Sequence, residues 1–144
     1  MQYLAAREHS YLELYQKLSQ KDFTRAEIEQ ALAGLIDDNL LSDLRFGEAF
    51  VRSRVGKGQG PVRIRQELKA KGLEDAQIDL AFKANDVDWE KVLETTWSKK
   101  FSYMDNGDAA LKLKQWRFLQ YRGFTQSQIS QFFRLKSRLM ASSE

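Results

Sequence analysis

Hydrophobic and polar positions recur along the chain with a helical period, in a pattern that is copied three times. The segments 14–32, 64–82 and 115–133 align without gaps, at offsets of 50 and 51 residues. Apolar residues spaced three and four apart predict helices, because such positions share one face of a helix. We therefore predict an all-α chain of tandem repeats, in which neighbouring units share their core.

Each copy of the pattern predicts a helix, a turn and a second helix. The first helix ends near a leucine, which is followed by a cation and then by glycine in two of the three copies. Gly72 and Gly123 suit a left-handed cap at the C-terminus of a helix. The next residue is apolar, and we expect it to fold back onto the helix that has just ended. The residues at the leucine and fold-back positions are Leu18, Leu68, Leu119, Phe23, Leu73 and Phe124.

The start of the second helix is also encoded in each copy. Thr24 with Glu27 and Thr125 with Gln128 have the spacing of a capping box, in which side chain and backbone cap each other. Ser10 with Glu13 has the same spacing at an earlier helix start. In each copy, two apolar residues four positions apart then predict the buried face of the second helix. These pairs are Ile28 and Leu32, Ile78 and Phe82, and Ile129 and Phe133.

A further helix precedes each of the last two pairs. One is capped by Ser42 or Asp43 and runs to about Val55. The other, before the third copy, carries an apolar face. The first repeat retains only Gln2 to Glu8 of its leading helix. We predict three tandem three-helix repeats at 1–41, 42–86 and 87–144, with a shortened first helix in repeat 1, arranged as an elongated, curved array. The apolar face is formed by Trp89, Val92, Leu93 and Trp97.

The linkers between the predicted helices are short. Residues 56–61 read Gly-Lys-Gly-Gln-Gly-Pro, and Pro61 suits the first turn of the next helix. This segment is consistent with a flexible interhelical turn, or with a glycine-rich basic loop that contacts a partner closely. Residues 104–108 predict another turn, with Asp108 as an N-cap.

Composition adds constraints on location and chemistry. The 144 residues include no cysteine, which excludes disulfides and thiolate zinc sites, and no apolar run approaches the ~20 residues of a membrane span. The N-terminus lacks the basic and apolar regions of a signal peptide. We expect a cytoplasmic monomer that does not associate with membranes.

Charge is unevenly distributed along the chain. The net charge is +3, but residues 45–72 alone carry +6, so the remainder carries −3. Because a basic region attracts an acidic partner or a phosphate backbone, this segment is the predicted binding surface. Its cations are spread over more than one helical face, which suits electrostatic contact better than base reading. They are Arg45, Arg52, Arg54, Lys57, Arg63, Arg65, Lys69 and Lys71.

Candidate catalytic chemistry has simpler explanations. His9 has no second His or Cys to act with, and we interpret it as an exposed residue at a helix start. The acidic clusters fall at helix ends, where caps explain them, and the glycine-rich loop lacks the Walker sequence. We predict a protein that is not an enzyme and has no cofactor and no metal. Helix–turn–helix pairs also leave open a DNA-binding protein.

Specific residues resemble the RecX family. Residues 40–54, LLSDLRFGEAFVRSR, are similar to the family's pattern of leucine, aspartate and Arg-Phe before an apolar helix that ends in Ser-Arg. Residues 58–73 resemble its Gly-x-Gly-Pro, Arg-Ile, Gln-Glu-Leu and Lys-Gly stretch. Residues 6–10 are similar to its Arg-Asp/Glu-His-Ser start, and 99–101 with 117–124 resemble its third repeat.

The resemblance implies a function that composition and spacing do not. It implies three three-helix repeats and a negative regulator of the RecA recombinase. Such a protein is expected to bind RecA and RecA–single-stranded DNA filaments, with weak direct DNA binding, and to inhibit ATP hydrolysis, strand exchange and coprotease activity. The alternative is a helix–turn–helix DNA-binding protein that acts independently of RecA.

Overall fold

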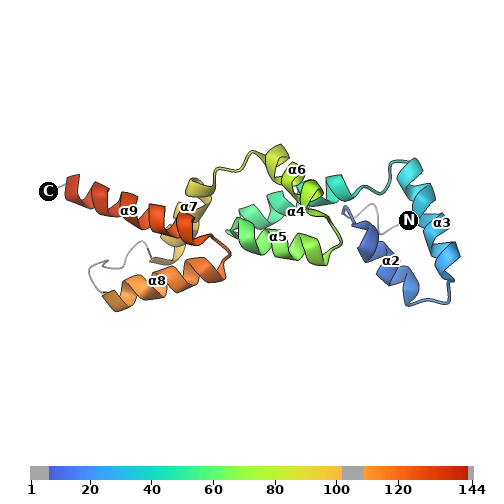
Figure 1. Cartoon of the computed structure of the whole chain (residues 1–144), viewed down its shortest axis with the longest axis horizontal. Coiled ribbons are helices and arrows are strands. Elements are labelled where there is room, and N and C mark those ends of the chain that lie inside the picture. The colour runs from blue at the N-terminus through green and yellow to red at the C-terminus, as the bar shows by residue number, and fades with distance from the viewer. Residues whose placement is uncertain (1–6, 102–108, 143–144) are drawn as a thin grey trace. The chain divides into compact units, whose positions relative to one another are not determined.

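The computed structural model describes residues 7–101 and 109–142, and in these ranges the chain forms eight helices and no strand (Figure 1). This confirms the all-helical prediction. The helices are α2 (Tyr11–Ser19), α3 (Arg25–Asp37), α4 (Asp43–Gly56), α5 (Pro61–Ala70), α6 (Asp75–Asn85), α7 (Trp89–Phe101), α8 (Ala109–Tyr121) and α9 (Gln126–Ser142).

The helices pack into two compact units. The first unit comprises Met1–Ser53 and Gln66–Asp86, and the second comprises Arg54–Arg65 and Val87–Glu144. Packing therefore divides the chain differently from the repeat, because residues 54–65 pack with the third copy of the pattern. The repeat boundaries at 41/42 and 86/87 stay a prediction.

In the first unit, α2 and α3 pack side by side (Figure 1). Their core consists of Leu14, Ile28, Leu32 and Leu41. Both helices begin with the predicted capping boxes: the Ser10 hydroxyl accepts from the Glu13 N–H at 3.1 Å, and Thr24 accepts from Glu27 at 3.2 Å.

The rest of the first unit is built on a close approach at Gly47. A Cβ at this position would lie 2.9 Å from the Leu73 side chain and 3.2 Å from the Ala81 Cβ. Because glycine has no side chain, α4 can approach α6 and the turn before it at this point. The buried apolar residues of α4, α5, α6 and the turn before α6 in this unit include Phe46, Val51, Leu68, Leu73, Ile78 and Ala81.

The predicted glycine caps are confirmed in two copies. Gly72 and Gly123 have φ values of 94° and 101°, and the residue after each is buried and donates its N–H to the leucine five residues earlier. The prediction was wrong for Phe23, which is 49% exposed. Asp22 occupies the glycine position without a positive φ, so the Phe23 N–H bonds to the Lys21 carbonyl at 2.8 Å and not to the Leu18 carbonyl, the acceptor that corresponds to those in the other two copies.

The second unit has a core formed by α7, α8 and α9. Leu93, Trp97 and Phe101 form the buried face of α7, which confirms the predicted apolar stripe. The Trp97 indole N–H donates to the Gln115 side chain at 3.0 Å, so a buried polar pair joins α7 to α8. The remaining core residues are Leu119, Phe124, Ile129 and Phe133.

The leading helices match the prediction only in part. α4 begins at Asp43, with the Ser42 hydroxyl accepting from the Arg45 N–H at 3.2 Å, and it ends at Gly56. The helix predicted for Gln2 to Glu8 does not include Arg7 or Glu8, which are not helical, and its other residues lie outside the described ranges. The 104–108 turn with Asp108 as N-cap lies outside them too.

Among the residues described, none forms a helix with enough length and apolar character to span a bilayer.

Candidate functional site

Six of the eight predicted cations lie on α4 and α5, where they do not form one face of either helix, and Lys57 and Lys71 each follow the last residue of a helix. Arg45 and Arg52 are seven residues apart on α4 and share a face, whereas Arg54 lies about 200° around the helix from Arg52. Arg63 and Arg65 are likewise separated on α5. The first unit contains Arg45, Arg52, Lys69 and Lys71, and the second contains Arg54, Lys57, Arg63 and Arg65.

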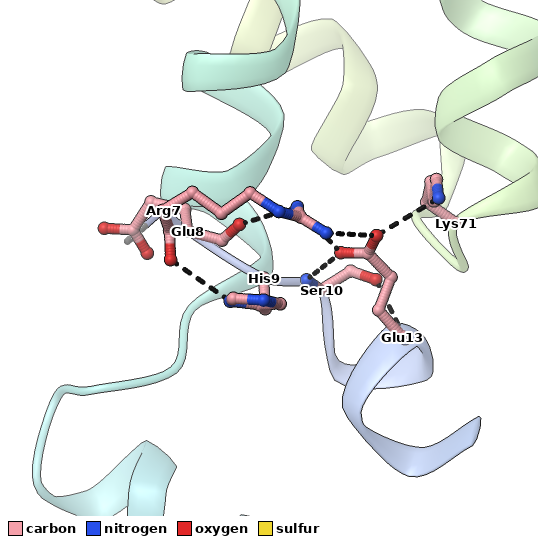
Figure 2. Close-up of polar contacts among 6 residues, drawn as sticks. All are labelled: Arg7, Glu8, His9, Ser10, Glu13 and Lys71. Carbon is pink, nitrogen blue, oxygen red and sulfur yellow. Dashed lines mark hydrogen bonds and ion pairs between the residues drawn. The ribbon is translucent and has the colours of Figure 1, made fainter. Parts of the chain in front are cut away.

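Lys71 takes part in a polar cluster within the first unit (Figure 2). Glu13, whose side chain is 10% exposed, receives the Lys71 ammonium and an Arg7 guanidinium nitrogen, each at 3.1 Å. The Ser10 backbone N–H donates to the same carboxylate at 3.0 Å. The side chain of Lys71 therefore joins the end of α5 to the start of α2, 58 residues earlier in the chain.

The cluster keeps Glu13 ionised. Burial by itself would raise the pKa of Glu13, but hydrogen bonds from Arg7, from the Ser10 backbone and from Lys71 outweigh it and lower the pKa to about 2. A carboxylate with three donors is stabilised in its charged form. The Lys71 cation is thus partly neutralised by an internal carboxylate.

His9 is buried, which corrects the prediction of an exposed residue at a helix start. Its side chain lies beside the cluster, the residue is 3% exposed, and the ring Nδ1–H donates to the Arg7 carbonyl oxygen at 3.1 Å (Figure 2). Burial, followed by the nearby charges of Arg7 and Lys17, lowers the pKa of His9. The buried site therefore favours the neutral form of the His9 ring.

Arg45 also makes internal contacts. Its guanidinium pairs with Glu8 at 3.1 Å and donates to the Asn39 side chain at 2.7 Å and to the Asn39 carbonyl at 2.9 Å. Asn39 has a φ of 59°, so Arg45 supports a left-handed residue in the turn between α3 and α4. The segment that contains Glu8 is attached to α4 a second time, because the Tyr11 N–H donates to the Asp43 side chain at 2.8 Å.

The other cations differ in how accessible they are. Arg52 and Lys57 are exposed and form no ion pair within residues 7–101 and 109–142. Lys69 is exposed and pairs with Asp75 at 3.1 Å, a contact open to solvent on both sides. Arg54, Arg63 and Arg65 are half-buried and have contacts of their own. Arg52, Lys57 and Lys69 are thus the most accessible charges.

The glycine-rich segment is a packed turn, which argues against a flexible linker. Within the second unit, the Gly60 N–H donates to the Arg122 carbonyl at 2.8 Å and the Val62 N–H donates to the Gly123 carbonyl at 2.9 Å. A Cβ on Gly60 would lie 2.4 Å from the Gly123 carbonyl carbon. Glycine permits this backbone approach, so the close contact is with another turn of the same chain.

Tyr121 is an accessible aromatic residue that sequence reasoning missed. It is 74% exposed at the end of α8, and the Arg63 guanidinium lies 5.3 Å from its ring centroid, close enough for a cation–π contact. The aligned repeat could have indicated it, because the corresponding positions are Gln20 and Ala70. An aromatic residue at a position that is polar or small in the other copies is not required by the repeat fold.

In the part of the chain that the structure describes, no three His, Asp or Glu side chains lie together in a way that could hold a metal ion.

Comparison with protein families agrees with the repeat. The models described as RecX first, second and third three-helix domain match residues 1–35, 42–81 and 87–133. The protein called Regulatory protein RecX in Pseudomonas fluorescens SBW25 is 46% identical over 130 residues, which are 90% of this chain and 84% of that protein. This chain belongs to the RecX family. Regulatory protein RecX of Vibrio campbellii is 43% identical with the same coverage.

Solved RecX structures share the fold. A crystal structure of regulatory protein RecX has a TM-score of 0.75 at 23% identity, covering 91% of this chain and 67% of the solved one. RecX from Lactobacillus salivarius has a TM-score of 0.74 at 21% identity, covering 92% and 88%. At these identities the likeness concerns the fold alone, and it supports the all-helical RecX architecture.

Proposed function

We propose that this chain is a negative regulator of the RecA recombinase. In this proposal it binds RecA and RecA–single-stranded DNA filaments, and it inhibits ATP hydrolysis, strand exchange and coprotease activity. The observation that carries the proposal is the match to all three RecX domains, together with relatives named as regulatory proteins over 90% of the chain.

The accessible cations support a partner with phosphate or acidic groups. Arg52, Lys57 and Lys69 are exposed, and cations of this kind attract a phosphate backbone without reading its sequence. Arg63 and Tyr121 add a cation beside an accessible ring, an arrangement on which a nucleobase can stack. Arg45 and Lys71 are assigned a smaller part, because their charges are paired inside the first unit.

The direct test is RecA ATPase activity on single-stranded DNA, titrated with this protein. We expect a saturable fall in ATP hydrolysis, and a parallel fall in strand exchange. Unchanged ATPase and strand exchange at protein concentrations above that of RecA would overturn the proposal.

Charge reversal tests the surface separately. Arg52→Glu with Lys57→Glu is expected to weaken filament binding by about tenfold or more, because both charges are exposed and each reversal places an acid near phosphate. Lys83→Glu with Lys91→Glu makes the same net change at other exposed positions and is expected to bind nearly normally. Equal binding by both double variants would show that Arg52 and Lys57 are not at the interface.

The alternative function is DNA binding without RecA, suggested by the helix–turn–helix pairs. It predicts tight binding to bare duplex, with affinity that falls steeply as salt rises. Fluorescence anisotropy on bare duplex, bare single strand and RecA filament separates the two. Strong filament binding with weak bare-DNA binding favours the regulator, and the reverse favours the alternative.

A further inference from the structure

A groove lies between α7 and α9 in the second unit, two helices that pack against each other. Its volume is about 460 Å³. Residues between 87 and 94, at and just before the start of α7, line one wall, and residues between 128 and 139, along most of α9, line the other. The groove shares no residue with the predicted basic surface and is a separate feature of the molecule.

The floor and one edge of the groove are apolar. Trp89, Leu93 and Phe132 form its inner part, and Leu135 and Leu139 continue it along α9. Leu135 is 42% exposed and Leu139 is 70% exposed, although they are spaced i, i+4 on one helical face. An exposed apolar stripe beside a groove is typical of a surface that a partner covers.

The cation on the α9 wall, Lys136, is held against aromatic rings of the core. The Lys136 ammonium lies 3.7 Å from the centroid of the Trp97 ring, in cation–π geometry, and 5.6 Å from that of Phe132. Gln128 and Gln131 supply neutral amides on the same wall. This wall therefore offers apolar contact and hydrogen bonding, with its one lining cation held against the core.

The α7 wall is acidic. Glu90 and Glu94 both line the groove, both are exposed, and they stand one turn apart on α7. Neither forms an ion pair with a cation in residues 7–101 or 109–142, and Glu90 accepts only a long hydrogen bond of 3.4 Å from Gln131. Two carboxylates at i, i+4 repel each other, so a cation brought between them is favourable.

We propose that this groove binds an amphipathic helix of another protein. Its apolar side chains would cover Leu135 and Leu139, and its lysine or arginine side chains would pair with Glu90 and Glu94. Charge complementarity selects this occupant, because an acidic wall faces an apolar one, and a helix with an apolar stripe flanked by cations matches both. The site goes beyond the proposed regulation of RecA and takes a partner of opposite charge to that expected at the basic segment.

The test uses the full chain without RecA or DNA. The probe is a fluorescein-labelled helical peptide of leucine, alanine and lysine with its leucines on one face, and its twin has every lysine replaced by glutamate. Anisotropy titration is expected to show saturable binding of the lysine peptide and about tenfold weaker binding of the glutamate twin. Equal binding of the two peptides, or binding of neither, would overturn the proposal.

Variants locate the binding on the chain. Glu90→Gln with Glu94→Gln, and separately Leu139→Asn, are each expected to weaken binding of the lysine peptide about fivefold or more. The controls are Asp22→Asn with Asp37→Asn, which matches the charge change in the first unit, and Leu113→Asn, which matches the apolar change at a residue of α8 that is 51% exposed. Equal losses in test and control variants would contradict the assignment.

A second copy of this chain is the competing occupant. Sedimentation velocity over a range of concentrations distinguishes it from an unrelated helix. A dimer that Leu139→Asn dissociates and Leu113→Asn leaves intact would show that the groove is filled by another copy, and would overturn the proposal. Because this assay and the peptide titration contain no RecA, their failure leaves the proposed function standing.

Discussion

At the scale of single residues, Glu13 links sequence positions that local patterns cannot connect. Its capping box with Ser10 was readable from spacing, since both partners lie within one turn. Its contacts with Arg7 and Lys71 were not, because they depend on how α5 ends beside α2. Glu13 thus acts both as a local cap and as a long-range tie within the first unit.

Replacing Glu13 tests this tie. Glu13→Gln keeps the shape but removes the charge that three donors share, and we expect it to lower the free energy of unfolding by about 1–2 kcal/mol, since Arg7 and Lys71 are partly exposed. Urea unfolding at neutral pH measures the change. Glu29→Gln, which breaks an exposed pair with Arg25, is the control and should change the value by less than about 0.5 kcal/mol.

Stability should also fall in acid, in two windows. The pKa of Glu13 is about 2 in the folded chain against 4.5 ordinarily, so its contribution is complete above pH 4.5 and is lost as pH falls toward 2. The lowered pKa of His9 also makes stability fall in acid. Its contribution to the free energy of unfolding is complete above pH 6.5 and is lost as the pH falls through the pKa of His9 in the folded chain.

Urea midpoints measured from neutral to acidic pH separate the two groups. Glu13→Gln should abolish the lower window and His9→Asn the upper one, because asparagine keeps a donor near the Arg7 carbonyl but does not titrate. A pH profile of His9→Asn identical to that of the unaltered chain would contradict the assignment of the upper window to His9.

At the scale of elements, two turns meet through glycine. The backbone N–H groups of Gly60 and Val62, at the start of α5, donate to the carbonyl oxygens of Arg122 and Gly123 after α8, and Gly60 lies against the backbone of Gly123. The glycine caps at 72 and 123 were predictable, because a left-handed residue after a helix has a local signature. The contact between Gly60 and Gly123 was not, because it joins residues far apart in the chain.

Gly60→Ala tests the contact between the turns. An added Cβ would meet the Gly123 backbone at 2.4 Å, so we expect a loss of about 1–3 kcal/mol in unfolding free energy. Gly56→Ala makes the same change in the same segment, where no atom lies within 4 Å, and should alter stability by less than about 1 kcal/mol. Thermal or urea unfolding of both variants gives the comparison, and similar losses would refute the steric explanation.

Elsewhere, the sequence predicted elements better than it predicted burial. Capping boxes, the Pro61 start of α5 and the apolar face of α7 follow from short-range spacing, and they are present. His9 and Phe23 were assigned the wrong environments. His9 is covered because its segment is attached to α4 through Tyr11 and Asp43, and Phe23 is exposed because Asp22 replaces the glycine of the other copies.

At the scale of the whole molecule, charge is divided between regions of opposite sign. Residues 45–72 carry +6 within a chain of net +3, yet Arg45 and Lys71 are paired internally. Counting charges in a sequence segment therefore overstates the number available to a partner. The sequence could identify the basic segment, but the pairing of its members depends on the tertiary fold.

The salt dependence of filament binding should reflect the cations that are available to a partner, which are fewer than the cations counted in residues 45–72. Filament affinity measured by anisotropy from about 50 to about 300 mM salt should fall as counterions are released, and Arg52→Glu with Lys57→Glu should flatten that slope. Lys71→Gln should change the slope less than Arg52→Gln does, because Lys71 already has Glu13 as a partner. If Lys71→Gln and Arg52→Gln reduced the slope equally, the distinction between the paired Lys71 and the accessible Arg52 would be wrong.

The bonds from Gly60 and Val62 to the turn after α8 also bear on how the chain can be cut. A fragment ending at residue 86 would keep the whole second copy of the sequence pattern, yet it would leave two amide donors without their carbonyl acceptors. We expect residues 54–65 of such a fragment to exchange their amide protons quickly and to be cleaved early by proteases. Genetic truncation at a repeat border would thus damage the copy that it was meant to preserve.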